Sequence, residues 1–317
     1  MSSKELTLKE TGAKLLEYQK LVLCTHISPD GDTLGSTLGL AHYLSQRGKE
    51  VLVLCDDVIN GTFAFLPGIE LFRVPEVGGR VACELLVVID ASSFDRIGAV
   101  GQAVKAIEVL NIDHHISNTH FADYLYLDTQ AAATGEIMCD LFDAMAWPMD
   151  KDIATCFYTA ILTDCGSFRN SNTTSKAMHR AAELLEYGVE PNSISDCLEV
   201  HSRETIDLLA KVLPSLTFVC DGRIAYLTVP QKLYRKEINM DSFVSYPRYT
   251  EGVDVALVFK EVESGVIRVS MRSRTVNVAE IAFAFGGGGH VRAAGCTVNL
   301  PLEEAQQLVL EKIAREI

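Results

Sequence analysis

The chain lacks the features that define several protein classes. Among its 317 residues there is no run of about 18 consecutive apolar residues, so no membrane span is expected. The opening segment, MSSKELTLKE, lacks the apolar core of a secretory signal peptide. The sequence also contains no internal repeat and no low-complexity tract.

Paired cysteines are absent as well. The nine cysteines are an odd number, and none of them forms a Cys-x-x-Cys pair. This pattern favours reduced thiols over a disulfide framework or a thiolate metal site, because disulfides belong to oxidising compartments. We therefore expect a cytoplasmic protein.

Basic residues are fewer than acidic ones, and the excess of acidic residues is distributed unevenly along the chain. The 28 Lys and Arg face 42 Asp and Glu, for a net charge of −14. Residues 1–190 hold 14 basic and 26 acidic side chains, whereas residues 191–317 hold 14 and 16. Such an acidic chain is not expected to bind long nucleic acid, duplex included, by counterion release. A small anionic substrate remains possible where a metal ion or a local basic patch meets it.

The length and the hydrophobic pattern predict two α/β domains. A chain of 317 residues exceeds the size at which one core usually keeps growing. Apolar runs alternate with helical stretches in the first part, which predicts a doubly wound parallel sheet with helices on both faces. The expected strands cover residues 21–26, 51–55, 85–90 and 107–112. We expect a first domain over 1–190, a helical connector over 191–214 and a smaller α+β domain over 215–317.

Acids and histidines follow the predicted strands and one predicted helix. They are His26, Asp30, Asp32, Asp90, Asp113, His114, His115 and Asp164. Ligands bind beyond the carboxyl ends of parallel strands, so these side chains are expected to share one crevice. Taken singly, Asp32 could be a helix cap and Asp90 a turn residue. Taken together, so many like charges repel unless cations neutralise them, and this donor set suits Mn²⁺ or Mg²⁺.

The motifs that carry these residues resemble those of the DHH phosphoesterase superfamily. The segments THISPDGD, VVIDAS, NIDHH and LTDCGSF follow one another in the family's order. The segments SMRSR (270–274) and FGGGGHVRAAG (285–295) resemble the smaller DHH-associated domain that follows the catalytic domain in many members. The length and layout are most similar to the oligoribonucleases of the nanoRNase/pAp-phosphatase type.

This resemblance implies a role for each residue. Two divalent cations are implied, with Mn²⁺ favoured and Mg²⁺ as the alternative. One would be held by His26, Asp30 and Asp90, and the other by Asp32, Asp90, His114 and Asp164, with Asp90 as the bridge. Asp113 would orient an imidazole, and His115 would face the substrate phosphate as hydrogen-bond donor or general acid.

The C-terminal motifs imply a substrate-binding role. Residues 223–292 hold ten basic and seven acidic side chains, and the four glycines 286–289 could offer backbone N–H groups to an anion. The resemblance implies that Gly288, Gly289 and His290 line the substrate cleft and that Arg272 grips a phosphate or stacks on a base. Arg274 and Arg248, the latter in the tyrosine-rich stretch YPRYT, are weaker candidates.

Together these observations predict a metal-dependent hydrolase of short single-stranded RNA or DNA, including dinucleotides such as pApA. The products would be mononucleotides, and 3′-phosphoadenosine 5′-phosphate would be a second substrate. The alternatives are a manganese-dependent inorganic pyrophosphatase, a RecJ-like single-strand exonuclease and a non-catalytic nucleotide-binding module. The sequence leaves a homodimer open.

Overall fold

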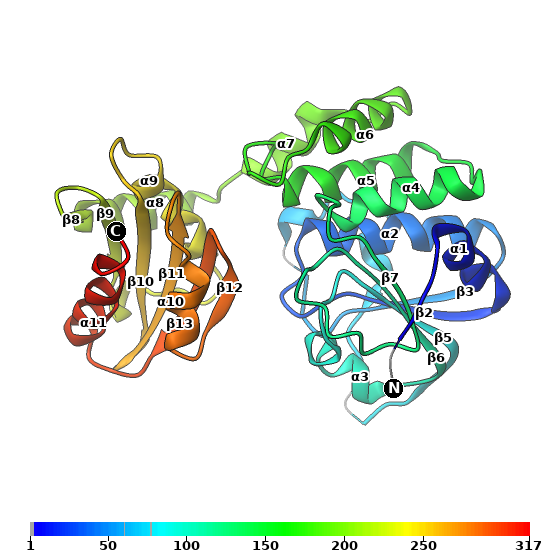
Figure 1. Cartoon of the computed structure of the whole chain (residues 1–317), viewed down its shortest axis with the longest axis horizontal. Coiled ribbons are helices and arrows are strands. Elements are labelled where there is room, and N and C mark those ends of the chain that lie inside the picture. The colour runs from blue at the N-terminus through cyan, green and yellow to red at the C-terminus, as the bar shows by residue number, and fades with distance from the viewer. Residues whose placement is uncertain (1–2, 60, 77) are drawn as a thin grey trace. The chain divides into compact units, whose positions relative to one another are not determined.

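The computed structural model describes residues 3–59, 61–76 and 78–317, with the side chain of His290 outside the described part. The chain divides into two units, Met1–Val200 and His201–Ile317 (Figure 1). The connector predicted over 191–214 is shared between them, because α7 (Pro191–Glu199) belongs to the first unit and α8 (Arg203–Val212) to the second. Within the described residues, no helix has the length and apolar character needed to cross a membrane.

The first unit is built on a seven-stranded sheet in which all the paired strands run parallel. The order is β1-β7-β6-β5-β2-β3-β4. Its strands are β1 (Lys4–Glu5), β2 (Lys20–Cys24), β3 (Glu50–Leu54), β4 (Phe72–Arg73), β5 (Val81–Ile89), β6 (Val104–Asp113) and β7 (Tyr124–Leu127). The central strands are apolar runs because both of their faces are buried. The predicted α/β class with a parallel sheet is confirmed.

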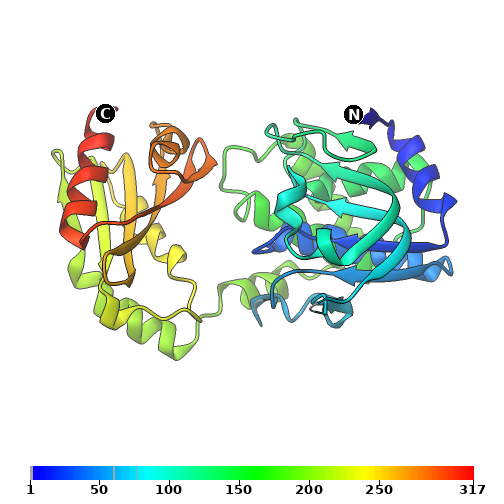
Figure 2. The same ribbon diagram turned by 90° about the horizontal axis from the view of Figure 1, so that it is seen from below.

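Helices cover the two faces of this sheet unequally (Figures 1 and 2). One face packs against α1 (Leu8–Glu17), α2 (Gly31–Gln46), α4 (Thr134–Met145) and α5 (Lys151–Asp164), and α6 (Ser175–Glu186) packs on α5. The other face has shorter cover from α3 (Val100–Ala103) and the 3₁₀ helix Phe94–Ile97. The main core, which includes Leu23, Leu85 and Phe142, therefore lies on the first of these faces.

Close packing of α2 on α5 sets the position of two acids. A Cβ atom on Gly35 would lie 2.2 Å from the carbonyl oxygen of Cys156, so α2 approaches α5 at backbone distance. Gly31, at the start of α2, packs in the same way on Thr163, near the end of α5. The start of α2 therefore meets the end of α5, which places Asp32 beside Asp164.

The second unit contains a six-stranded mixed sheet of order β12-β13-β11-β10-β9-β8. Its strands are β8 (Thr217–Val219), β9 (Ile224–Val229), β10 (Val255–Glu263), β11 (Val266–Ser273), β12 (Gly288–His290) and β13 (Ala293–Val298). One face packs on α10 (Val278–Ala284) and α11 (Leu302–Ala314), and the other on α8 and the 3₁₀ helix Met240–Val244, which runs into α9 (Ser245–Arg248). The predicted smaller α+β unit is thus present.

Part of the glycine run of the second unit lies in a strand. Gly288 and Gly289 belong to β12, which pairs with β13 in antiparallel register. A Cβ atom on Gly287 would lie 2.2 Å from the carbonyl oxygen of Gly295. The close approach of this segment to β13 is therefore a physical reason for glycine here, and the run is not one continuous loop.

Candidate functional site

The strand ends of the first unit converge as the sequence predicts. β2, β5 and β6 are neighbours in the sheet and run parallel, so the residues that follow them meet at one edge. His26 follows β2, Asp90 follows β5, and β6 ends at Asp113. Three overlapping groups of side chains lie close enough to hold metal ions, with the ligand atoms of each group within 4.8 Å of one another. The groups are His26–Asp30–Asp90, Asp32–His114–Asp164 and Asp90–His114–His115.

Asp90 joins the groups. Its Oδ2 lies 3.6 Å from Nε2 of His26, and its Oδ1 lies 3.5 Å from Nε2 of His114. The backbone of Asp90 has a φ of 61°, a left-handed conformation that Asp adopts more readily than most residues. Each oxygen of this buried carboxylate therefore faces a different imidazole.

Both of these imidazoles present Nε2 to the carboxylates. Nδ1 of His26 lies 2.8 Å from the carbonyl oxygen of Ile27, and Nδ1 of His114 lies 3.2 Å from that of Ala131. A carbonyl only accepts, so Nδ1 carries the proton in each ring and donates it. The Nε2 lone pairs are then available to a cation, as in metal-binding histidines.

Asp30 and Asp32 have different structural roles. Asp30 is the N-cap of α2 and accepts the backbone N–H groups of Asp32 and Thr33. Asp32 is only 1% exposed and accepts the N–H groups of Thr134 and Gly135 at 2.7 and 2.9 Å. The alternative that Asp32 caps its own helix is therefore wrong, since Asp32 caps the start of α4 instead.

Mutual repulsion and burial are the conditions under which this cluster could hold a cation. Burial raises the pKa of Asp32 well above its usual range, and the charges of Asp90, Asp164 and Asp30 add to the effect. Burial likewise raises the pKa of Asp164 to about 6. Divalent cations relieve such repulsion, and carboxylates with imidazoles are suitable ligands for Mn²⁺ or Mg²⁺. The donor set therefore fits a divalent metal centre.

His115 and Asp113 form a pair beside the cluster. Nδ1 of His115 donates to Oδ1 of Asp113 at 2.7 Å, and Asn118 donates to the other oxygen at 2.6 Å. Burial lowers the pKa of His115, but the bond to Asp113 and the charges of Asp90, Asp113 and Asp164 together raise it, so the net direction is upward. Burial also opposes ionisation of Asp113, yet the bonds to His115 and Asn118 and the charges of His115 and His114 together bring its pKa below the usual value. This arrangement resembles the carboxylate–imidazole pairs that orient a ring for proton transfer.

Sequence reasoning missed three residues that hold the cluster. Thr134 donates its hydroxyl to Oδ1 of Asp90 at 2.9 Å, and Asn172 donates to Oδ2 of Asp164 at 3.0 Å. Asn118 holds Asp113, as described above. The only available signal was that Asn172 lies in the polar stretch after Asp164. Arg96 lies 3.4 Å from Nδ1 of His26, but this nitrogen already donates to Ile27, so the contact is not a hydrogen bond.

Two of the predicted residues of the second unit, Arg272 and His290, lie at the same level of the sheet. Arg272 of β11 is in register with Ala293 of β13, which is in register with His290 of β12. The backbones of Arg272 and His290 are thus two strand spacings apart, about 10 Å. Gly288 and Gly289 precede His290 on β12. Since the side chain of His290 is outside the described part, only its backbone position is placed.

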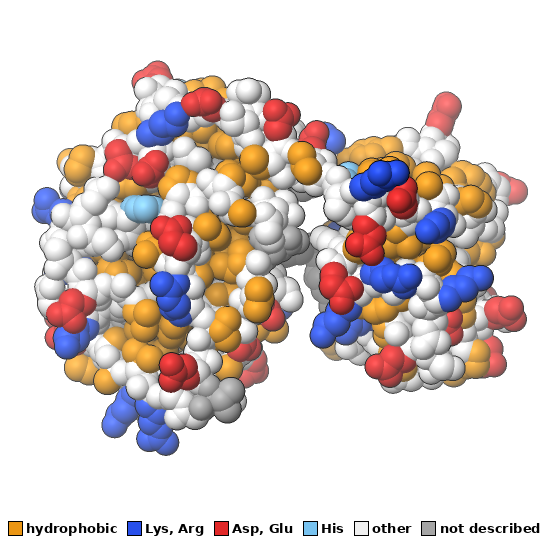
Figure 3. All heavy atoms as spheres, turned by 180° about the vertical axis from the view of Figure 1, so that it is seen from behind, with side chains coloured by type: hydrophobic (Ala, Val, Ile, Leu, Met, Phe, Trp, Pro, Cys, Tyr) orange, Lys and Arg blue, Asp and Glu red, His pale blue; other side chains and the backbone are white. Residues whose placement is uncertain are grey.

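The arginines near this level of the sheet have no carboxylate partner among the described ion pairs. Arg272 donates to the carbonyl oxygen of Met271, and Arg274 donates to that of Arg248. Burial lowers the pKa of Arg272, and the nearby charge of Arg248 lowers it further, although Asp241 opposes them. On the face shown in Figure 3, Lys and Arg side chains lie among Asp and Glu over the smaller, second unit. Basic side chains are therefore present on this face of the second unit, interspersed with acidic ones.

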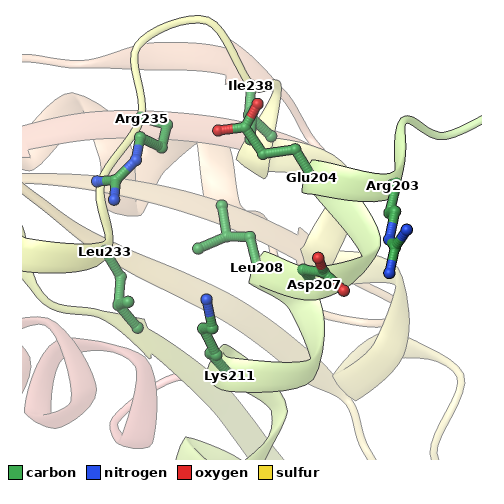
Figure 4. A pocket seen from close by; sticks show the side chains of 8 residues that line it. All are labelled: Arg203, Glu204, Asp207, Leu208, Lys211, Leu233, Arg235 and Ile238. Atoms are coloured by element: carbon green, nitrogen blue, oxygen red, sulfur yellow. The ribbon is translucent and has the colours of Figure 1, made fainter.

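A cavity of about 330 Å³ in the second unit lies apart from these residues. It is lined by Arg203, Glu204, Asp207, Leu208, Lys211, Leu233, Arg235 and Ile238. Figure 4 shows side chains of both signs around the apolar Leu208 and Leu233. None of the predicted site residues lines it, and its mixed charges indicate no particular ligand.

Comparisons with known proteins cover nearly the whole chain. The sequence matches the DHH family, N-terminal domain, over residues 20–161 and the DHHA1 domain over residues 221–317. It is 37% identical over 299 residues to the bifunctional oligoribonuclease and PAP phosphatase NrnA of Thermus thermophilus, covering 94% of this chain and 90% of that one. The Bacillus subtilis protein of the same name is 24% identical and covers 94% of this chain and 96% of its own.

A solved structure has the same fold. It is an exopolyphosphatase-related protein from Bacteroides fragilis, with a TM-score of 0.86 and 23% sequence identity. The similarity covers 96% of this chain and 94% of the other. At this identity, the match supports the arrangement of strands and helices and not a shared substrate.

Proposed function

The chain belongs to the DHH family of phosphoesterases, and we propose that it hydrolyses short oligonucleotides to mononucleotides and dephosphorylates 3′-phosphoadenosine 5′-phosphate. The resemblance drawn from the motifs is thereby confirmed. The observation that carries the proposal is the set of three overlapping His/Asp groups, in which Asp90 belongs to two groups and His114 to two. Relatives named oligoribonuclease and PAP phosphatase indicate the substrate class.

Two divalent cations would complete this centre. His26, Asp30 and Asp90 would hold one, and Asp32, Asp90, His114 and Asp164 would hold the other. When bound, the cations would polarise the phosphate and activate the attacking water. Mn²⁺ is our first choice, with Mg²⁺ as the alternative, because the ligands are carboxylates and imidazoles without thiolates.

The residues of the chain itself perform three tasks in this proposal. Asp113 holds the His115 ring through Nδ1, which leaves Nε2 as the atom that delivers a hydrogen bond or proton to the substrate. The carboxylates and imidazoles of the cluster would hold the cations in place. Buried side chains around the cluster, such as Ala132 and Cys165, exclude bulk water from its inner side.

The second unit would bind the substrate away from the hydrolysed bond. We assign phosphate contacts to Arg272, Arg274, Gly288, Gly289 and His290, since Arg and backbone N–H groups are common phosphate ligands. Tyr249, with Arg248 stacked 5.7 Å from its ring centre, is 58% exposed and could accept a base. This short row of groups suits a short substrate.

Substrate length is the decisive measurement. Hydrolysis should be followed for pApA, a series of RNA and DNA strands from dinucleotides to about 24-mers, 3′-phosphoadenosine 5′-phosphate and pyrophosphate, each with Mn²⁺ and with Mg²⁺. Rates should fall as the strand lengthens, because a row of few contacts adds nothing for a long strand and the acidic first unit repels it. Rates that rise with length, or rapid cleavage of pyrophosphate alone, would refute the proposal.

We also propose a cytoplasmic location. All nine cysteines are free thiols, and seven of them are buried. Reduced thiols are typical of the cytosol. Whether the protein is a homodimer is open to measurement by light scattering.

A further inference from the structure

The segment Ala131–Gly135 is hydrogen-bonded to the ligands of one proposed cation. Its carbonyl at Ala131 accepts Nδ1 of His114, and its N–H groups at Thr134 and Gly135 donate to Asp32. The Thr134 hydroxyl donates to Asp90. The fourth ligand, Asp164, is reached through Asn172, which donates to Oδ2 of Asp164 and to the carbonyl oxygen of Ala132 at 3.0 Å each.

The segment is itself held in place from two sides. A Cβ atom on Gly135 would lie 2.5 Å from Cβ of Ala160, so α4 starts in close contact with α5. The N–H of Ala132 donates to the buried carboxylate of Glu136, which also pairs with Lys176 at 3.0 Å. Because both supports are buried contacts, a shift of the segment would disturb packing as well as hydrogen bonds.

The hydroxyl of Thr134 makes a side-chain hydrogen bond to Asp90, which a backbone N–H group does not replace. Ala133 is the N-cap of α4 and has no capping side chain, and the Thr134 hydroxyl does not bond within its own helix. It points instead to Oδ1 of Asp90, the oxygen nearest His114. The ordinary role of a threonine at a helix start, which is to bond its own backbone, is thus not the role seen here.

We propose that Thr134 is a positioning residue for the metal centre. Its hydroxyl fixes the rotation of the Asp90 carboxylate. Oδ1 then faces His114, and Oδ2 faces His26. Without this bond the carboxylate can turn, and one oxygen no longer faces each group. The inference rests on the proposed function only in requiring that the cluster binds cations, and it requires no particular substrate.

A pair of matched variants tests the hydrogen bond. Thr134→Val keeps the shape of the side chain and removes the donor, whereas Thr134→Ser keeps the donor. Thr37→Val is the control, because Thr37 is a buried threonine of α2 whose hydroxyl has no hydrogen-bond partner. Binding of Mn²⁺ alone should be measured by equilibrium dialysis and metal analysis, alongside circular dichroism and hydrolysis of pApA.

We expect Thr134→Val to weaken Mn²⁺ binding by about 10- to 100-fold, the usual effect of removing a residue that orients a metal ligand. Thr134→Ser and Thr37→Val should bind as the natural protein does. The role of the hydroxyl would be overturned if Thr134→Val bound Mn²⁺ as tightly as the natural protein. It would also be overturned if Thr134→Ser and Thr134→Val lost Mn²⁺ affinity to the same extent. A natural protein that bound no Mn²⁺ would instead overturn the metal centre and this inference with it.

Asn172→Ala provides a second route if Thr134→Val does not fold. Asn172 supports the same segment through Ala132 and orients Asp164. Its loss should also weaken Mn²⁺ binding by about 10-fold or more while the helical content is retained. Unchanged Mn²⁺ affinity in a folded Asn172→Ala protein would contradict the positioning role of the segment.

Discussion

His115 donates from Nδ1 to the carboxylate of Asp113 across 2.7 Å, and Asp113 has no solvent exposure. The orientation of the His115 ring is therefore fixed by a buried carboxylate that a substrate does not reach. Such a pair is expected to act on the reaction and not on metal retention.

Replacement of His115 by Ala should lower kcat by about 10²- to 10⁴-fold, the range that general acid–base groups supply. Mn²⁺ content should remain close to that of the natural protein, because His115 is in neither proposed ligand set and all of the proposed ligands are retained. Steady-state hydrolysis of pApA and metal analysis of the same samples provide the check. Loss of a bound Mn²⁺ would show that His115 is a metal ligand instead.

Asp90→Ala should have a broader effect. Among the residues that the structure describes, Asp90 is the one carboxylate that faces both His26 and His114, so both cations would lose a shared ligand. We expect the bound Mn²⁺ to fall from two to fewer than one per chain and turnover to become undetectable. Metal analysis after dialysis tests this directly, and substantial residual turnover would contradict the bridging role.

Arg272→Ala should mainly raise KM. A residue that binds the ground state and the transition state equally changes KM and leaves kcat nearly constant. We expect about a 10-fold or larger rise with pApA, since a charge-assisted contact contributes about 1.5–3 kcal/mol. Arg268→Ala is the control, because Arg268 is an exposed arginine of the same strand. An unchanged KM would argue against a substrate contact.

Asp241 and Lys260 give the second unit a pH-dependent stability. Lys260 is 7% exposed and bonds both Asp241 and Ser270. Burial opposes ionisation of Asp241, but the charge and hydrogen bond of Lys260, with help from Ser270 and Arg272, together lower the pKa. The carboxylate therefore stabilises the fold above its unfolded pKa of about 3.9, and this contribution is lost as the pH falls through the lower folded pKa.

Asp241→Asn should reduce the free energy of unfolding at pH 7 by about 1–2 kcal/mol, between the values for exposed and buried ion pairs. The difference from the natural protein should shrink below about pH 4. Urea unfolding at several pH values would measure both effects. A difference that stayed constant down to pH 2 would assign the effect to packing.

The proximity of the site residues could be predicted because parallel strands align their carboxyl ends. His26, Asp90 and Asp113 each stand at such an end, so the sheet alone brings them together. The supporting residues could not be found in this way. Thr134 and Asn118 are ordinary polar residues, and their partners depend on how helices and loops pack.

Some elements of the fold also lacked a sequence signal. β7 is only the four residues Tyr124–Leu127, and its side chains do not form a long apolar run. β12 is a strand of Gly288, Gly289 and His290, a composition that predicts a turn. Both form because a neighbouring strand offers unpaired backbone groups, which is a tertiary effect.

The capping of α4 by Asp32 joins chemistry and folding in one carboxylate. A relative that had lost its activity would still benefit from this aspartate, because the start of α4 would otherwise carry two buried, unpaired N–H groups. Among the described hydrogen bonds, His26 caps no helix, and its Nδ1 bonds only the carbonyl oxygen of the adjacent Ile27. In a survey of degenerate descendants, retention of Asp32 would thus say little about catalysis, whereas loss of His26 would be the earlier and more informative sign.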